Sequence, residues 1–120
     1  MIPTLNGINK AFESKARLGI MSVLMVNESV DFSTLKSLLS LTDGNLASHT
    51  RALEDLGYIQ CEKRFIGRKP NTSFSITKAG SQAFKEHLKA LEDFIKNTSA
   101  KFFYLIHFAL QSTLKQTTQR

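Results

Sequence analysis

Residues 31–57 read DFSTLKSLLSLTDGNLASHTRALEDLG, and this stretch decides the fold. Asp31 precedes the apolar positions of a short helix, and Thr42 precedes those of a longer one. Both residues are good helix caps, because their side-chain oxygens accept the free amide hydrogens of a first helical turn. Gly57 predicts the end of the longer helix, since glycine adopts the left-handed conformation without steric cost. Two helices joined by a tight turn are therefore expected.

The flanking residues add two more helices and a β-hairpin. Apolar residues recur at spacings of three to five from Leu5 onward, which predicts one first helical segment ending near Asn27. After the second of the two central helices the period changes to two, so short strands are expected around residues 59–65 and 73–76. The connection, residues 66–71, is rich in turn residues and contains a proline, which predicts the hairpin tip. Thr77 then caps a fourth helix.

This succession of elements is the order of a winged helix-turn-helix, in which the third helix lies in the DNA major groove and the hairpin, called the wing, reaches the flanking backbone. The expected fold class is mainly α with a small antiparallel β wing and an extra C-terminal helical segment. The motifs that carry a family likeness are RLGI (17–20), DFSTLK (31–36), LTDGNLASH (41–49), LEDLGY (53–58), KRFIGRKPNT (63–72) and ITKAG (76–80). With these motifs the chain resembles bacterial winged-helix transcription regulators of the MarR and ArsR kind, and especially their small stand-alone branch. The resemblance implies a DNA-binding protein.

Length and charge narrow the class of partner. The chain has 120 residues, enough for one domain, and 16 Lys plus Arg against 10 Asp plus Glu give a net charge of +6. This balance favours a polyanionic partner, most often nucleic acid. The longest apolar runs are about nine residues, whereas a membrane span takes roughly 20. No export signal is visible, so a cytoplasmic protein without membrane contact is expected.

The third helix is expected to read DNA bases. If Leu46, Leu53 and Leu56 face the core, the opposite side presents the candidate recognition residues Asn45, Ser48, Arg51 and Ala52. Arginine pairs with guanine and asparagine with adenine, each worth roughly 1–3 kcal/mol of discrimination. His49 lies between the two faces: the resemblance implies a place near the DNA backbone, and the alternative is a histidine at the edge of the core with a ring nitrogen bonded to the backbone. The alternative for the whole face is a solvated surface that reads nothing.

The hairpin is expected to grip phosphates. Between residues 63 and 72 there are four cations and no acid, namely Lys63, Arg64, Arg68 and Lys69. Residues 60–80 carry five cations and one acid, and therefore most of the net charge of the chain. Phosphate contacts need cations on a projecting element, and Arg68 suits a narrow minor groove. The alternative is a basic loop that is only solvated. Arg17 and Lys36 are expected either to add contacts to the DNA backbone or to pair with acids such as Glu54.

The C-terminal part predicts a dimer. Apolar residues step by four and three from Phe84 to Ala109, the pattern of a heptad seam. The candidate dimerisation residues are Leu88, Leu91, Ile95, Phe102, Leu105 and Ile106. Exposed apolar surface of this extent usually marks an interface. Residues 1–96 are thus expected to form the winged helix DNA-binding domain and residues 97–120 a C-terminal helical extension for dimerisation. The alternative is a monomer whose tail folds back on its core.

The function expected is a sequence-specific, double-stranded DNA-binding transcription regulator, a dimeric repressor that reads an inverted repeat. The alternative is a protein-protein interaction module whose apolar C-terminal segment binds a partner. No nucleophile-base pair or phosphate-binding glycine loop has a supporting context, so neither an enzyme nor catalytic residues are expected. Cys61 is the only cysteine, and His87 and His107 lie 20 residues apart and far from it, so no metal site or cofactor is expected. A small-molecule effector is left open, and the residues considered for its pocket, or else for a dry core, are Phe84, Leu88, Phe102 and Phe103.

Overall fold

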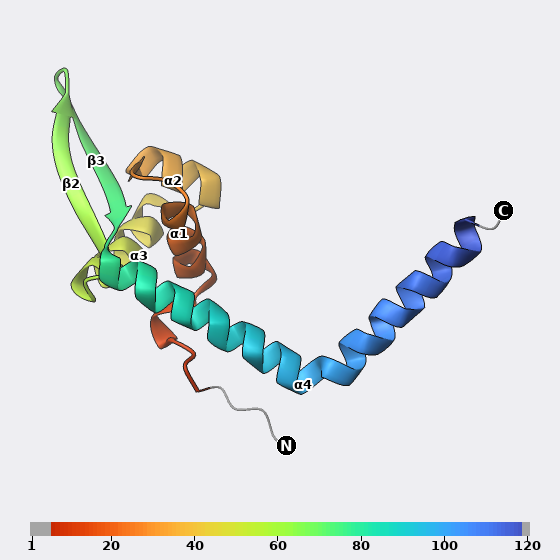
Figure 1. Cartoon of the computed structure of the whole chain (residues 1–120). Helices are drawn as coiled ribbons and strands as arrows, with labels where there is room; N and C mark the ends of the chain where they lie inside the picture. The colour runs from red at the N-terminus through yellow and green to blue at the C-terminus, as the bar shows by residue number, and fades with distance from the viewer. Residues whose placement is uncertain (1–5, 119–120) are drawn as a thin grey trace. The chain divides into compact units, whose positions relative to one another are not determined.

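The computed structural model describes the backbone of residues 6–118 and the side chains of residues 6–96 and 104–112. Its elements follow in the order η1 (Lys10–Phe12), α1 (Lys15–Met25), β1 (Val30–Asp31), α2 (Phe32–Leu39), α3 (Asp43–Asp55), β2 (Ile59–Ile66), β3 (Lys69–Ile76) and α4 (Lys78–Thr118) (Figure 1). Residues 9–87 form one compact unit, and of the other described residues 6–8 and 88–118 belong to a second unit. The first unit holds the helix-turn-helix and the wing. The expected fold, mainly α with a small antiparallel wing, is confirmed.

The first helix is shorter than expected. The apolar spacing predicts a single segment from Leu5 onward, but α1 starts at Lys15 and the separate 3-10 turn η1 precedes it. Two capping side chains cause the break. Asn9 Oδ1 accepts the N–H two residues on at 2.9 Å, and Ser14 Oγ accepts the N–H three residues on at 3.4 Å. These side chains compete with helical carbonyls as acceptors, so they start new elements inside the periodic stretch. Leu5 itself lies outside the described residues.

The helix-turn-helix forms where the caps predict it. Asp31 Oδ1 accepts the Thr34 N–H at 2.7 Å at the start of α2, and Thr42 Oγ1 accepts the Asn45 N–H at 3.2 Å at the start of α3. Between the two helices Ser40 adopts a left-handed φ of 52°, which ends α2 and turns the chain. Both predicted caps are therefore confirmed.

The wing belongs to a three-stranded antiparallel sheet with the strand order β1-β3-β2. β2 and β3 pair along their whole lengths, from Ile59 opposite Ile76 to Ile66 opposite Lys69. β1 pairs with β3 through Val30 opposite Phe74. The sequence did not reveal β1, because two residues are too few for an alternating pattern.

The hairpin tip is tighter than expected. The sequence predicts a tip over residues 66–71, but residues 69–71 belong to β3 and only Gly67 and Arg68 form the turn. Gly67 supplies a positive φ of 64°, as the first position of a type II′ turn requires. Pro70 is tolerated inside β3 because β1 covers only the far end of that strand and leaves an open edge beside the proline.

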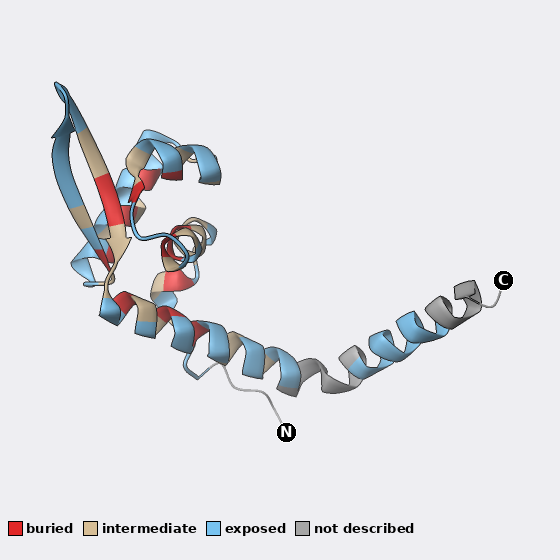
Figure 2. Ribbon diagram, turned by 45° about the horizontal axis from the view of Figure 1, so that its top comes forward, coloured by how far each residue is buried: buried red, intermediate tan, exposed pale blue. Residues whose placement is uncertain are grey.

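The core of the first unit lies where the helices meet the base of the sheet, while the outer wing is exposed (Figure 2). Its buried apolar side chains are Phe12, Ile20, Met21, Leu24, Val30, Leu35, Leu46, Leu53, Ile59, Phe74 and Phe84. Burial of one such side chain stabilises the fold by about 1.5–3 kcal/mol. Leu56 was expected in this set but is 51% exposed. It is the C-cap residue of α3 and keeps right-handed helical φ and ψ, so its exposure shows that the neighbouring elements do not cover this end of the helix. Thr50 is buried instead, and its hydroxyl donates to the Leu46 carbonyl at 2.9 Å.

A hydrogen-bonded joint ties the end of α3 to the start of α4. Gly57 has a φ of 78° and ends α3 as expected. The Thr77 hydroxyl donates to the Gly57 carbonyl at 2.6 Å and accepts the Gly80 N–H at 2.9 Å, which confirms Thr77 as the cap of α4. Gly80 packs so closely here that an added Cβ would lie 2.7 Å from the carbonyl carbon of Tyr58. Because β2 leaves this joint and β3 returns to it, the joint holds the base of the wing.

The start of α4 contributes to the core of the first unit. The ring of Phe84 meets that of Phe12 edge-on at 5.3 Å. His87 is only 2% exposed, and its Nδ1 accepts the Asn9 N–H at 3.0 Å. Burial lowers the pKa of His87, although the negative charge of Glu13 acts in the opposite direction. The lowered pKa keeps the ring neutral near pH 7. No helix among residues 6–118 is long and apolar enough to cross a membrane.

Candidate nucleic-acid interface

The outer face of α3 is polar. Asn45, Ser48 and Arg51 are exposed on the side away from the buried leucines, and Ala52 is half-buried. Among the described residues no partner uses the side-chain donors and acceptors of Asn45 and Arg51, so they are available to base edges. The base-reading role of these four residues stays a prediction.

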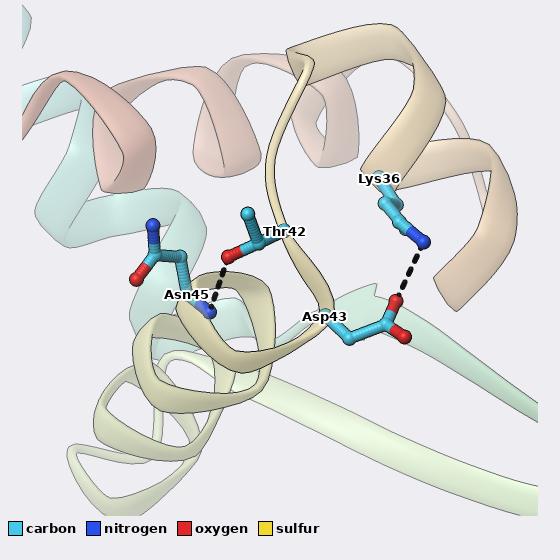
Figure 3. Close-up of polar contacts among 4 residues, drawn as sticks. All are labelled: Lys36, Thr42, Asp43 and Asn45. Atoms are coloured by element: carbon cyan, nitrogen blue, oxygen red, sulfur yellow. Dashed lines mark hydrogen bonds and ion pairs between the residues drawn. The ribbon is translucent and has the colours of Figure 1, made fainter.

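The N-terminal end of α3 carries one acid, Asp43, and that acid is paired. Lys36 Nζ of α2 lies 2.8 Å from Asp43 Oδ1, next to the Thr42 cap (Figure 3). Of the two alternatives for Lys36, the structure therefore favours pairing with an acid, although the partner is Asp43. The pair is exposed and stabilises the fold by less than about 1 kcal/mol. Its electrostatic effect matters more, because it offsets a negative charge at the helix end expected to approach phosphates.

His49 lies on the flank of α3 that faces α1. Its Nδ1 accepts a hydrogen bond from Arg17 Nε of α1 at 3.1 Å, and both residues are half-buried. The alternative with a ring nitrogen bonded to the backbone is therefore wrong, because the partner is a side chain. Within the described part of the chain Arg17 forms no ion pair, so of its two alternatives the pairing with an acid is wrong, and the contact to the DNA backbone stays a prediction.

The wing distributes its cations over two faces, because side chains alternate along a strand. Lys63 shares a face with the buried Ile59, whereas Arg64 lies on the opposite face. There Arg64 Nη2 lies 2.7 Å from Glu62 Oε2, and both side chains are more than half exposed. Arg68 is in the turn, and Lys69 begins β3. Among the described residues the other three cations form no ion pair, so Arg64 alone has its charge partly compensated.

The wing tip also carries two exposed apolar side chains that were not proposed as functional residues. Phe65 is 74% exposed and Ile66 is 63% exposed. The sequence pattern predicted Phe65 in a strand and Ile66 in the hairpin tip, but gave no sign that the strand extends beyond the core. They flank Gly67 and Arg68, so the tip combines apolar surface with positive charge.

A groove of about 260 Å³ joins α3 to the wing. Its lining residues are Phe32, Ala47, Thr50, Arg51, Glu54, Cys61, Lys63, Thr72 and Phe74. Arg51 of α3 and Lys63 of β2 thus lie along one groove, one a candidate base reader and the other a candidate phosphate contact. Burial raises the pKa of the Cys61 thiol, which keeps the thiol protonated and poorly nucleophilic.

The C-terminal part of α4 exposes apolar side chains. Leu88 is 44% exposed, Ile95 45%, Leu105 62% and Ile106 40%, and Leu91 is half-buried. The side chain of Phe102 lies outside the described residues. Phe84 belongs to the core of the first unit and not to an exposed seam, because it packs on Phe12. The dimerisation role of this surface stays a prediction, as does the boundary at residue 96, which falls within α4.

The described residues hold no cluster that suits a metal ion, and they leave the question of an effector pocket open. The described part of the chain contains no group of three or more His, Cys, Asp or Glu side chains that suits a metal ion. Of the four residues considered for an effector pocket, Phe84 is 2% exposed in the core, and the side chains of Phe102 and Phe103 lie outside the described residues.

Comparison with known proteins agrees with the fold. The family model described as a winged helix DNA-binding domain matches residues 16–95. A protein of Methanocaldococcus jannaschii described as uncharacterized is 36% identical over 88 residues, which cover 73% of this chain and 96% of that protein. A transcriptional regulator homologue from Pyrococcus horikoshii OT3 is 35% identical, with a TM-score of 0.68 over 73% of this chain and 87% of that one.

More distant structures share the fold. YusO of Bacillus subtilis is 17% identical, with a TM-score of 0.72 over 93% of this chain and 81% of its own. MarR is 16% identical, with a TM-score of 0.65 over 92% of this chain and 82% of its own. The MarR-like winged helix expected from the sequence motifs is thereby confirmed.

Proposed function

The chain belongs to the family of winged helix DNA-binding domains and is a DNA-binding regulator; we propose that it is a dimeric transcriptional repressor that reads an inverted repeat in double-stranded DNA. Each subunit inserts α3 into the major groove of one half-site and places its wing on the flanking phosphates. Repression follows from occupation of the site. The transcriptional regulator homologue from Pyrococcus horikoshii OT3, at 35% identity, supports a role in transcription.

The observation that carries this proposal is that the candidate base-reading side chains lie on α3, whereas the candidate phosphate-binding cations lie on the wing of the same unit. The outer face of α3 offers uncharged Asn45 and Ser48 together with Arg51, while the wing holds Lys63, Arg68 and Lys69 without a paired acid among the described residues. Base edges are read by hydrogen-bond donors and acceptors, whereas phosphates are held by cations. The groove shared by α3 and β2 connects the two surfaces, so one DNA duplex can contact both.

Exposed apolar residues on α4 support the dimer. Tyr104, Leu105, Ile106, Phe108 and Leu110 are each at least 40% exposed within two turns of helix. Such a cluster gains free energy when a second copy covers it. A two-fold dimer would present two recognition helices to half-sites about one helical turn, roughly 34 Å, apart.

Selection of bound sequences from a random duplex pool tests the proposal as a whole. The expected result is an enriched pair of inverted half-sites whose centres lie about 10 base pairs apart or a multiple of that distance. Binding should also weaken steeply as salt rises, since each neutralised phosphate releases counterions. Absence of enrichment together with no retention on duplex DNA at low salt would refute DNA binding.

Two pairs of substitutions separate reading from phosphate contact. Replacing Arg68 and Lys69 with alanine is expected to weaken binding to all sequences alike and to flatten the salt dependence by about 1.8 per subunit. Replacing Asn45 or Arg51 with alanine is expected to cost about 1–3 kcal/mol on the selected site and to relax preference at one base position. If both pairs of changes act alike on selected and random DNA, the division between α3 and the wing is wrong.

The exposed apolar cluster on α4 also suits a second candidate function, binding of a different protein through this segment. Truncation at Thr98 distinguishes the two. A dimeric repressor would become monomeric in sedimentation and lose affinity for the full inverted repeat while it keeps weak half-site binding. An interaction module would keep its oligomeric state after the same truncation.

A further inference from the structure

Arg17 and His49 form a side-chain hydrogen bond between α1 and α3, and this bond settles which ring nitrogen of His49 is free. Arg17 Nε donates to His49 Nδ1 at 3.1 Å. A guanidinium group keeps its protons at every pH that proteins experience, so it is always a donor and Nδ1 must be the acceptor. A neutral imidazole carries one proton, which therefore sits on Nε2. No described residue uses that Nε2–H.

The bond also fixes the direction of the ring. Nδ1 and Nε2 lie on opposite sides of the imidazole, so a ring that turns Nδ1 toward α1 turns Nε2 away from α1. Arg17 is itself well placed, because it lies in the first turn of α1 and its N–H donates to the cap Ser14. On α3, His49 follows Asn45 by four residues and therefore lies on the same flank of the helix, one turn further along.

From these contacts we infer that Arg17 is a positioning residue for DNA binding: it holds His49 with its Nε2–H directed to a phosphate oxygen beside the half-site. The inference rests on the proposed function. His49 then contributes a neutral, oriented donor, in contrast to the cations of the wing. Arg17 acts through His49 and does not itself touch the DNA. Without Arg17 the ring would have to be ordered on binding, at a loss of roughly two- to tenfold in affinity.

A double-substitution cycle on the full-length protein tests the inference, with affinity for the selected duplex as the readout. Arg17→Ala and His49→Ala are each expected to weaken binding several-fold. The double variant is expected to bind like His49→Ala alone, since there is no ring left to position. Lys15→Ala is the matched control, because it removes an exposed cation from the same turn of α1 and is expected to leave affinity nearly unchanged.

Two further readouts exclude other roles. The Arg17→Ala variant is expected to keep the wild-type salt slope, whereas a direct phosphate contact would lower the slope by about 0.9 per subunit. His49→Gln, whose amide nitrogen falls near the Nε2 position, is expected to bind more tightly than His49→Asn, whose amide nitrogen falls near Nδ1.

Three results would overturn the inference. Additive losses in the double variant, or a reduced salt slope, would mean that Arg17 contacts phosphate directly. A lower melting temperature with unchanged affinity for Arg17→Ala would mean that the bond only ties α1 to α3. All of these outcomes presuppose that the wild-type protein binds DNA and that the double substitution Arg68→Ala and Lys69→Ala weakens this binding. If neither result is obtained, the proposed function itself fails, and not only this inference.

Discussion

Glu62 is the one acid of the wing, and its removal should strengthen DNA binding. Its Oε2 lies 2.7 Å from Arg64 Nη2, and both side chains are exposed, so the Arg64 charge is partly compensated in the free protein. The substitution Glu62→Gln keeps the size of the side chain and removes its charge. Arg64 is then available to a phosphate, and the one negative charge of the wing is gone.

The magnitude follows from counterion release. One additional phosphate contact steepens the slope of log K against log salt by about 0.9 per subunit, or about 1.8 per dimer. Affinity rises when the salt is lowered from 200 to 50 mM, and this rise is expected to be larger for Glu62→Gln than for the wild-type protein by a factor of about 3.5 per subunit, or roughly 12 for the dimer. Loss of the exposed ion pair costs less than about 1 kcal/mol of stability, so folding does not mask the effect.

The assay is fluorescence anisotropy with the selected duplex at several salt concentrations. Glu92→Gln is the matched control, because Glu92 forms a comparable exposed pair with Lys96 at 2.8 Å on α4, outside the wing. The control is expected to change neither affinity nor slope. An unchanged slope for Glu62→Gln, or an equal change in both variants, would show that Arg64 does not reach a phosphate and would refute the reasoning.

Three further predictions concern stability and assembly. Gly80→Ala is expected to destabilise the protein by about 2–3 kcal/mol and to lower its melting temperature by roughly 10–15 °C, because the added Cβ meets backbone atoms. Gly44→Ala is the control: no heavy atom lies within 4 Å of its new Cβ, so the melting temperature is expected to stay the same or to rise. Equal melting temperatures of the two variants in thermal unfolding would disprove the close packing at Gly80. Burial lowers the pKa of His87 in the folded state, so the unfolded chain takes up the proton first and stability is expected to fall as the pH drops below about 6.5. Between pH 7.5 and 5.5, the free energy of unfolding measured with denaturant should decrease less for His87→Gln than for the wild-type protein. An equal decrease in both proteins would assign the effect to other groups. Leu105→Glu is expected to convert the dimer to a monomer in sedimentation equilibrium. Gln111 is also exposed on the same helix, and Gln111→Glu is expected to leave the dimer intact. A dimer that survives both changes would place the interface elsewhere.

Local signals determined most of the fold from the sequence. Asp31, Thr42 and Thr77 cap their helices through hydrogen bonds that reach only three residues along the chain, so the residue type and the apolar spacing suffice to find them. Gly57 ends α3 for an equally local reason, its positive φ. The charge of the wing is also a property of composition. These features together predict a winged helix and the two surfaces that it offers to DNA.

The tertiary structure alone decided how the pieces are coupled. The bond from Arg17 to His49 joins residues 32 apart, and the strand β1 exists only because Val30 finds Phe74 across the sheet. The sequence predicted a buried Leu56 and a six-residue hairpin tip, and both were wrong because helix ends and strand registers are fixed by what packs against them. Periodicity describes one element at a time, whereas the orientation of a reading or phosphate-binding side chain depends on its neighbour from another element. For that reason the sequence named His49 as a candidate, and only the packing of α1 on α3 gave its ring a direction.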